Sequence, residues 1–228
     1  MHIFILGATG QNGQLIVKSA LAKSHTVTAM VRNPSSSSLP QNSNLTIVSG
    51  STTSPADLEA AMRSPRQPNA IIMALGHRRS GSSPFSAPAP DSPHDLFELT
   101  TRALVSAIKA IGFAIPPKLI INSAQGVGPS WKSMALPVRF IFSHSPAMRI
   151  GLADHGRMDA VVRESGLPFV LARPTGLMSG PARDVRVWPE DGKGAAWIST
   201  ITRESLAAWL VDAVEKDEWD GTAPVISN

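Results

Sequence analysis

The chain contains no cysteine and no tyrosine, and aromatic residues make up only 5% of its 228 residues. The lack of cysteine excludes disulfide bonds, thiolate catalysis and metal sites with cysteine ligands. The sequence has six histidines: His2, His25, His77, His94, His144 and His155. Because these show no paired spacing of metal ligands, we expect no metal site.

Long hydrophobic runs are also missing from the sequence. No apolar run approaches the roughly 18 residues that a membrane-spanning helix needs. The first seven residues are apolar, but they lack the basic region and the small-residue cleavage site of a signal peptide. We therefore expect them to be part of the fold, and we expect a cytoplasmic protein without a membrane partner.

The charge balance is only mildly basic, with 21 Lys and Arg against 17 Asp and Glu, and 43% of the residues are hydrophobic. This composition is typical of a soluble globular protein. The basic residues are scattered and have no aromatic residues between them, whereas a nucleic-acid-binding protein usually clusters them. The pattern favours a small anionic ligand and argues against a nucleic-acid partner.

Short apolar runs alternate with helical patterns along the chain. We expect six strands, buried on both faces, at residues 3–6, 27–31, 45–48, 70–75, 118–122 and 169–172. Strands that alternate with helices predict right-handed βαβ units. The fold class is therefore α/β, with a doubly wound parallel sheet flanked by helices. The length fits a single domain over residues 1–228.

Two helix starts carry the same signal. Ser54-Pro55-Ala56-Asp57 and Ser92-Pro93-His94-Asp95 each place a capping serine before a proline and an acid. Serine caps the free N–H groups of a first helical turn, and proline fits that turn because it has no N–H. Each serine is thus expected to be an N-cap, and Gly112 is expected to end the second helix.

Three segments follow predicted strands without a clear pattern of their own: residues 77–94, 126–146 and 177–199. The carboxyl ends of parallel strands form the ligand crevice in such folds, so we expect these segments to be substrate-pocket loops. The alternative is plain surface loops. Trp131, Trp188 and Trp197 in the last two segments either line a pocket for an aromatic substrate or fix the loops to the core.

A glycine-rich turn directly follows the first predicted strand. It reads Gly7-Ala8-Thr9-Gly10-Gln11-Asn12-Gly13 and opens a helix. The first glycine permits the tight turn, the second lets the backbone approach a pyrophosphate, and the third allows the helix to pack closely on the strand. This context predicts a Rossmann-type dinucleotide site formed by Gly7, Thr9, Gly10, Gln11, Asn12 and Gly13. The alternative is a turn that binds nothing.

The end of the second predicted strand indicates which dinucleotide binds. An acid at this point usually holds the ribose 2′-hydroxyl of NAD, whereas a basic group suits the 2′-phosphate of NADP. The sequence here is Met30-Val31-Arg32-Asn33-Pro34, without an acid. Arg32 offers a permanently charged fork of donors, so we expect NADP(H) as the cofactor, unless Arg32 is simply solvated.

These motifs resemble the atypical short-chain dehydrogenase/reductase group, in particular its NmrA-like and biliverdin reductase B (flavin reductase)-like families. The segments that carry the resemblance are residues 7–13, 31–34, 121–123, 154–158, 164–167, 173–174 and 201–207. The resemblance implies a Rossmann-type fold and an NAD(P) cofactor. It also implies further cofactor contacts from Ser51, Ala74, Leu75, Gly76, Ser123, Pro174 and Thr175.

The resemblance also bears on catalysis. The wider superfamily uses a serine after the fifth strand and a Tyr-x-x-x-Lys motif on the next helix. Ser123 is at the serine position, while Gly151 and His155 stand where the tyrosine and the lysine are expected. Biliverdin reductase B-like proteins carry a histidine in a similar Asp-His context. We therefore take Ser123 and His155 as the candidate catalytic residues.

Several functions are compatible with these residues. The first is an NADP(H)-dependent oxidoreductase, a reductase or dehydrogenase, that acts on a small carbonyl, quinone, flavin or aromatic acceptor. The second is a non-redox isomerase or cyclase, which the missing tyrosine favours. The third is an NADP-sensing regulatory protein, as the NmrA-like resemblance implies. In each case we expect a small-molecule ligand and a monomer or homodimer.

Overall fold

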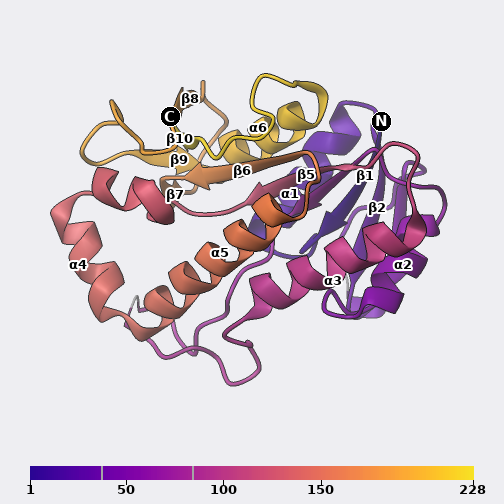
Figure 1. Cartoon of the computed structure of the whole chain (residues 1–228), viewed down its shortest axis with the longest axis horizontal. Coiled ribbons are helices and arrows are strands. Elements are labelled where there is room, and N and C mark those ends of the chain that lie inside the picture. The colour runs from indigo at the N-terminus through magenta and orange to yellow at the C-terminus, as the bar shows by residue number, and fades with distance from the viewer. Residues whose placement is uncertain (37, 84) are drawn as a thin grey trace.

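The computed structural model describes residues 1–36, 38–83 and 85–228, and its centre is an eight-stranded sheet of order β3-β2-β1-β4-β5-β6-β10-β8 (Figure 1). Its strands are β1 His2–Leu6, β2 Thr26–Val31, β3 Leu45–Ser49, β4 Ala70–Met73, β5 Lys118–Asn122, β6 Phe169–Pro174, β8 Arg186–Trp188 and β10 Val225–Ser227. All neighbours pair in parallel except β8, which runs antiparallel to β10. The predicted α/β fold is confirmed.

Helices cover both faces of this sheet. They are α1 Gln11–Ala22, α2 Pro55–Arg63, α3 Leu96–Ile111, α4 Leu136–His144, α5 Pro146–Glu164 and α6 Arg203–Glu215, with 3₁₀ turns η1 Pro34–Ser36 and η2 Gly128–Ser133. A small parallel sheet joins β7 Gly176–Met178 to β9 Thr200–Thr202. In the described part of the chain, no helix combines the length and the apolar character that a membrane crossing requires.

The two faces of β1 explain how the helices are divided. Successive side chains of a strand point to opposite faces. Ile3 and Ile5 pack in one hydrophobic cluster with α1 and α6, while Phe4 and Leu6 pack in the other cluster with α2, α3 and α5. All four side chains are fully buried. Figure 1 shows α3 and α5 side by side below the sheet.

The strand order reverses beside β1. The chain moves outward from β1 to β2 and β3, then returns to place β4 on the other side of β1. The connections that follow β1 and β4 therefore diverge, which opens a crevice at the carboxyl ends of these strands. This crevice is the position where doubly wound sheets bind ligands.

Three expectations about the strands and loops need correction. Strand β3 is an edge strand and not buried on both faces, since Ile47 is 37% exposed. The segment 126–146 contains η2 and α4, and 177–199 contains β8. The predicted loop 77–94 is irregular where described, and its residue 84 lies outside the described residues.

The predicted helix starts have different outcomes. The hydroxyl of Ser54 accepts the N–H of Asp57, as expected of an N-cap. The N-cap at Ser92 is wrong, because α3 begins only at Leu96 and the Ser92 hydroxyl accepts the N–H of Arg78. The first turn of α3 instead donates to a carboxylate on α5, described below. Gly112 ends α3 with a left-handed conformation (φ 67°), as expected.

Candidate functional site

A cavity of about 890 Å³ opens at the point where the strand order reverses. Four connections contribute to its wall: the glycine loop after β1, the end of β2, the turn after β3 and the segment after β4. We call it the switch-point cavity. Of the predicted cofactor-binding residues, it is lined by Gly7, Thr9, Gly10, Gln11, Asn12, Arg32, Ala74, Leu75 and Gly76.

The glycine loop has a geometry that only glycine permits at two positions. Gly7 has φ +85°, and a Cβ there would lie 2.6 Å from the carbonyl oxygen of Ala74. A Cβ on Gly13 would lie 2.0 Å from the carbonyl oxygen of Gly7. Gly13 is buried, so its part is to let α1 pack closely on the loop rather than to face a ligand.

The start of α1 fits a phosphate group. Its N-cap is Gly10, which provides no side-chain cap, and its first turn holds no acid. The N–H groups of this turn therefore keep the partial positive charge that attracts anions at helix N-termini. In the same turn, the buried Oδ1 atom of Asn12, a hydrogen-bond acceptor, has no partner among the described residues.

Basic residues surround the same cavity. Arg32 is exposed at the end of β2, and Arg79 and Arg203 also line the wall. Arg78 lines it too and forms an ion pair with Asp91, the only acid among the lining residues. This surplus of positive charge favours an anionic ligand. Sequence analysis missed Arg203, because its contact with the cavity depends on where α6 packs.

Ser51 lies outside the cavity wall. Its backbone N–H donates to Oδ2 of Asp57 across 2.8 Å, and its hydroxyl pairs with that of Thr53 at 3.0 Å. Its neighbours Gly50 and Thr52 line the cavity instead. The turn after β3 thus reaches the site, although through residues other than the one predicted.

The predicted residues on β5 and β6 do not line the switch-point cavity. Ser123 and Thr175 follow the ends of these neighbouring strands, and both are buried. Within the described ranges, neither hydroxyl has a hydrogen-bond partner. Pro174 ends β6, and its carbonyl accepts the N–H of Gln125. Unpaired buried hydroxyls are costly, and neither of these two has a compensating hydrogen bond within the described residues.

His155 is likewise not part of the cavity wall. Its ring stacks on Phe97, with 4.2 Å between the ring centroids. Burial, together with the nearby charge of His77, lowers the pKa of His155 to about 4 against the opposing effect of Asp154. His155 is therefore neutral at neutral pH. Its buried Nδ1 atom has no hydrogen-bond partner in the part of the chain that the structure describes.

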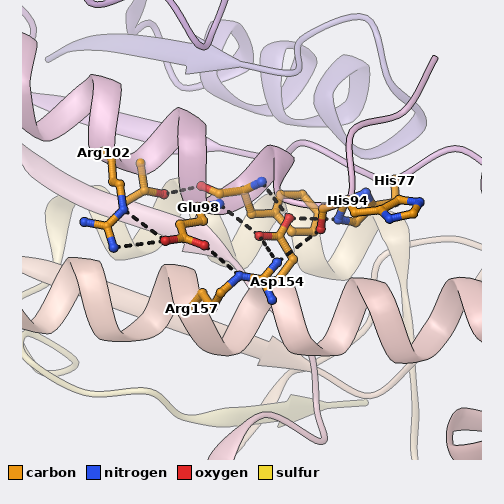
Figure 2. Close-up of polar contacts among 8 residues, drawn as sticks. His77, His94, Glu98, Arg102, Asp154 and Arg157 are labelled. Carbon is orange, nitrogen blue, oxygen red and sulfur yellow. Dashed lines mark hydrogen bonds and ion pairs between the residues drawn. The ribbon is translucent and has the colours of Figure 1, made fainter. Parts of the chain in front are cut away.

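The structure pairs two residues that sequence analysis did not connect, His77 and Asp154. His77 follows β4 and lines the switch-point cavity, and its Nε2 atom lies 2.9 Å from Oδ2 of Asp154 on α5. Figure 2 shows this pair within a network that extends through Arg157 and Glu98. The two residues are 77 positions apart. No local pattern in the sequence links them.

A second cavity of about 440 Å³ lies among η2, α4 and α5. Its lining is mostly apolar and includes Trp131, Phe142 and Leu152. Trp131 thus lines a pocket, which is one of the two roles that the sequence left open for the tryptophans. Trp188 instead hydrogen-bonds Ser227 on β10, and Trp197 is exposed.

One known protein family matches most of the chain. The family model described as NAD(P)H-binding matches residues 7–217. The chain belongs to this family. The match begins at the first glycine of the loop and ends beyond α6, and it confirms the resemblance to the NAD(P)-binding families of the atypical short-chain dehydrogenase/reductase group.

Individual relatives are distant. An uncharacterized chloroplastic protein of Arabidopsis thaliana is 26% identical over 227 residues, which cover 95% of this chain and 72% of the relative. The oxidoreductase ylbE from Lactococcus lactis has a TM-score of 0.73 at 19% identity, and the match covers 100% of this chain and 91% of ylbE.

Two further solved structures share the fold. A short-chain dehydrogenase/reductase of Veillonella parvula, in complex with NADP, has a TM-score of 0.74 at 18% identity and covers 100% and 94% of the two chains. ChuY from Escherichia coli O157:H7, described as an anaerobillin reductase, has a TM-score of 0.70 at 17% identity, with 100% and 97% covered. At these identities the likeness concerns the fold alone.

Proposed function

We propose that the protein is an NADP(H)-dependent reductase or dehydrogenase that acts on a small carbonyl, quinone, flavin or aromatic acceptor. The observation that carries this proposal is the shared wall of the switch-point cavity. The glycine loop and Arg32 line the same cavity, at the place where this fold class binds dinucleotides. Membership of the NAD(P)H-binding family supports the same cofactor class.

Different residues of the cavity bind different parts of the cofactor. The first turn of α1 accommodates the pyrophosphate, and Arg32 pairs with the ribose 2′-phosphate. The backbone of Ala74, Leu75 and Gly76 forms the opposite wall. When bound, the nicotinamide group supplies a hydride for transfer to the acceptor.

The buried polar groups beyond the cavity have a part in the proposal as well. The Ser123 hydroxyl hydrogen-bonds a carbonyl oxygen of the ligand, and Thr175 and Pro174 contact the nicotinamide side of the cofactor. The unpaired hydroxyls of Ser123 and Thr175 support this assignment. Neutral His155 holds the nicotinamide ribose through a hydrogen bond, for which its unpaired Nδ1 atom is suited.

A non-redox isomerase or cyclase is the second candidate, and one observation favours it. The chain has no tyrosine, so the usual proton donor of short-chain dehydrogenases/reductases is missing. Turnover of a substrate without any change in NADPH absorbance would favour this alternative.

The first experiment compares the binding of NADPH and NADH by calorimetry for the wild type and Arg32→Ala. Hydrogen bonds to charged groups contribute about 1.5–3 kcal/mol, so we expect Arg32→Ala to weaken NADPH binding by about tenfold or more and to leave NADH binding nearly unchanged. Arg186→Ala is the matched control, since Arg186 is exposed on β8, away from the cavity wall. An equal loss for both nucleotides would contradict the role of Arg32.

The second experiment measures NADPH oxidation with a panel of flavins, quinones and aromatic ketones. Oxidation that depends on the acceptor supports the reductase. If neither nucleotide binds to the wild type, the assignment of the cavity itself is wrong. If NADPH binds and no acceptor is reduced, the reductase assignment fails.

A further inference from the structure

His77, which lines the switch-point cavity, forms a hydrogen-bonded pair with Asp154. The His77 ring is only 12% exposed, and Asp154 is fully buried. The edge of the ring packs against Phe97, with 4.5 Å between the centroids. The ring is therefore held between a carboxylate and an aromatic side chain, so that its orientation relative to the cavity is restricted.

Four donors fix the carboxylate of Asp154 (Figure 2). It accepts the N–H of Phe97 at 2.8 Å and that of Glu98 at 3.1 Å, together with His77 and Arg157. Burial alone would raise the pKa of Asp154, but the hydrogen bonds from His77 and from these two N–H groups hold it below its usual range. Asp154 is thus ionised at neutral pH, and its carboxylate faces Nε2 of His77.

The other ring nitrogen of His77 is left for a ligand. Among the described residues, the hydrogen bond of the ring runs through Nε2 to Asp154. A carboxylate on one nitrogen fixes the orientation of an imidazole and leaves the other nitrogen to exchange a proton. His77 lines the switch-point cavity, and Nδ1 is the ring nitrogen that Asp154 does not use.

The surroundings of Gly151 point to the same residue. Gly151 stands on α5 where the resemblance expects the tyrosine, and a Cβ there would lie 3.6 Å from Cδ2 of His77. The space next to this glycine is thus occupied by the imidazole. A proton donor on the loop after β4 would take the place of the tyrosine side chain that α5 lacks.

We infer that His77 is the catalytic proton donor in the reduction of a carbonyl acceptor, and that Asp154 is its positioning residue. This inference rests on the proposed function. As the carbonyl carbon takes a hydride with its electron pair from reduced cofactor, the C=O π bond breaks toward oxygen. The oxygen takes the proton from Nδ1 of His77, so an alcohol and oxidised cofactor are the products. Water then returns a proton to the ring.

Several titratable and charged groups surround this histidine. Asp154, His155 and Arg157 approach from α5, and Glu98 from α3. Arg78 and Asp91 form an ion pair in the adjoining loop. His155 is neutral above pH 4, so it carries no extra proton to donate at neutral pH.

The test compares an aromatic ketone with a quinone, which takes its protons from water, as acceptors for the wild type and His77→Gln. General acid catalysis contributes about 10²–10⁴-fold, so the ketone rate should fall by about 100-fold or more. This loss should exceed the loss with the quinone by at least about tenfold. The control is His144→Gln, the same substitution at an exposed side chain on α4 that lines neither described cavity.

Asp154→Asn tests the positioning role, because it removes the charge and keeps only one of the two oxygens that accept the N–H groups of Phe97 and Glu98. The ketone rate should fall more than the quinone rate, as in His77→Gln, because the carboxylate no longer orients the imidazole. A variant that loses only thermal stability, with an unchanged ratio of ketone to quinone rates, would reduce Asp154 to a helix cap and overturn its positioning role.

A test that does not depend on turnover treats the protein with diethyl pyrocarbonate and locates the modified histidines by mass spectrometry. His77 should be labelled in the free protein and protected by NADP⁺ with the product alcohol. An unlabelled or unprotected His77 overturns the inference. If the wild type reduces neither acceptor, the proposed function fails and the proton donation with it. If both acceptors are reduced and His77→Gln slows them equally, the proposed function stands and the donor assignment falls.

Discussion

Arg173 on β6 donates from a terminal guanidinium nitrogen to Oδ2 of Asp159 on α5 across 2.8 Å. Arg173 is 1% exposed, so its charge depends on this partner within the protein. The pair lies between α5 and the carboxyl end of β6, two residues before Thr175. It therefore connects the helix that carries Asp154 and His155 to the sheet.

Asp159→Asn should lower the free energy of unfolding by about 3 kcal/mol, because removing one partner of a buried ion pair leaves the other charge uncompensated. Chemical denaturation of both proteins measures this difference. Glu190→Gln is the control, since Glu190 also approaches Arg173 but is 37% exposed, and its loss should cost less than about 1 kcal/mol. Equal effects of the two substitutions would show that Arg173 is not held mainly by Asp159.

Gly13→Ala should abolish nucleotide binding and destabilise the fold. Its Cβ would lie 2.0 Å from the carbonyl oxygen of Gly7, a backbone atom, so the start of α1 has to move away from the loop. Calorimetry with NADPH and a thermal melt measure the two effects. Unchanged nucleotide affinity in a folded Gly13→Ala variant would contradict the close packing.

Gly156→Ala is expected to have the opposite effect on stability and to raise the free energy of unfolding. Gly156 lies within α5, and a Cβ there would meet nothing within 4 Å. Glycine in a helix interior costs about 0.5–1 kcal/mol relative to alanine, so the substitution should stabilise the protein by about this amount. The midpoint of chemical denaturation provides the measurement. A decrease in stability would mean that α5 is strained at this position.

Stability should rise with pH between about 4 and 6.5. Burial together with the charge on Arg66 lowers the pKa of His2 to about 4, and burial together with the charge of His77 lowers that of His155 to about 4. In this window the unfolded chain binds more protons than the folded protein, so the free energy of unfolding increases with pH and levels off above 6.5. His155→Phe should flatten the rise in denaturation experiments across pH 4–7. An unchanged slope in this variant would contradict a neutral, buried His155.

The sequence predicted the fold well where local patterns decide it. The glycine loop, the six parallel strands and the cap at Ser54 depend on residues within a few positions of one another, and the structure contains all of them. Strand β3 was expected to be buried because its residues are apolar. The apolar pattern does not reveal that this strand lies at the edge of the sheet.

The candidate site was predictable only in part, because sequence patterns reflect local contacts and not the packing of distant segments. The cavity wall formed by the glycine loop, Arg32 and residues 74–76 follows from strand ends, which are visible in the sequence. The pairing of His77 with Asp154 and the stacking of His155 on Phe97 depend on how α5 packs against α3. Such contacts between distant segments leave no periodic signal.

The carboxylate of Asp154 has a consequence for the order in which the chain acquires structure. The N–H groups of Phe97 and Glu98 find their acceptor 57 and 56 residues further along the chain. While the polypeptide is being synthesised, the first turn of α3 emerges long before this acceptor. Its first turn has to remain hydrated until α5 arrives, so a nascent chain that stops before residue 154 would have a frayed start to α3.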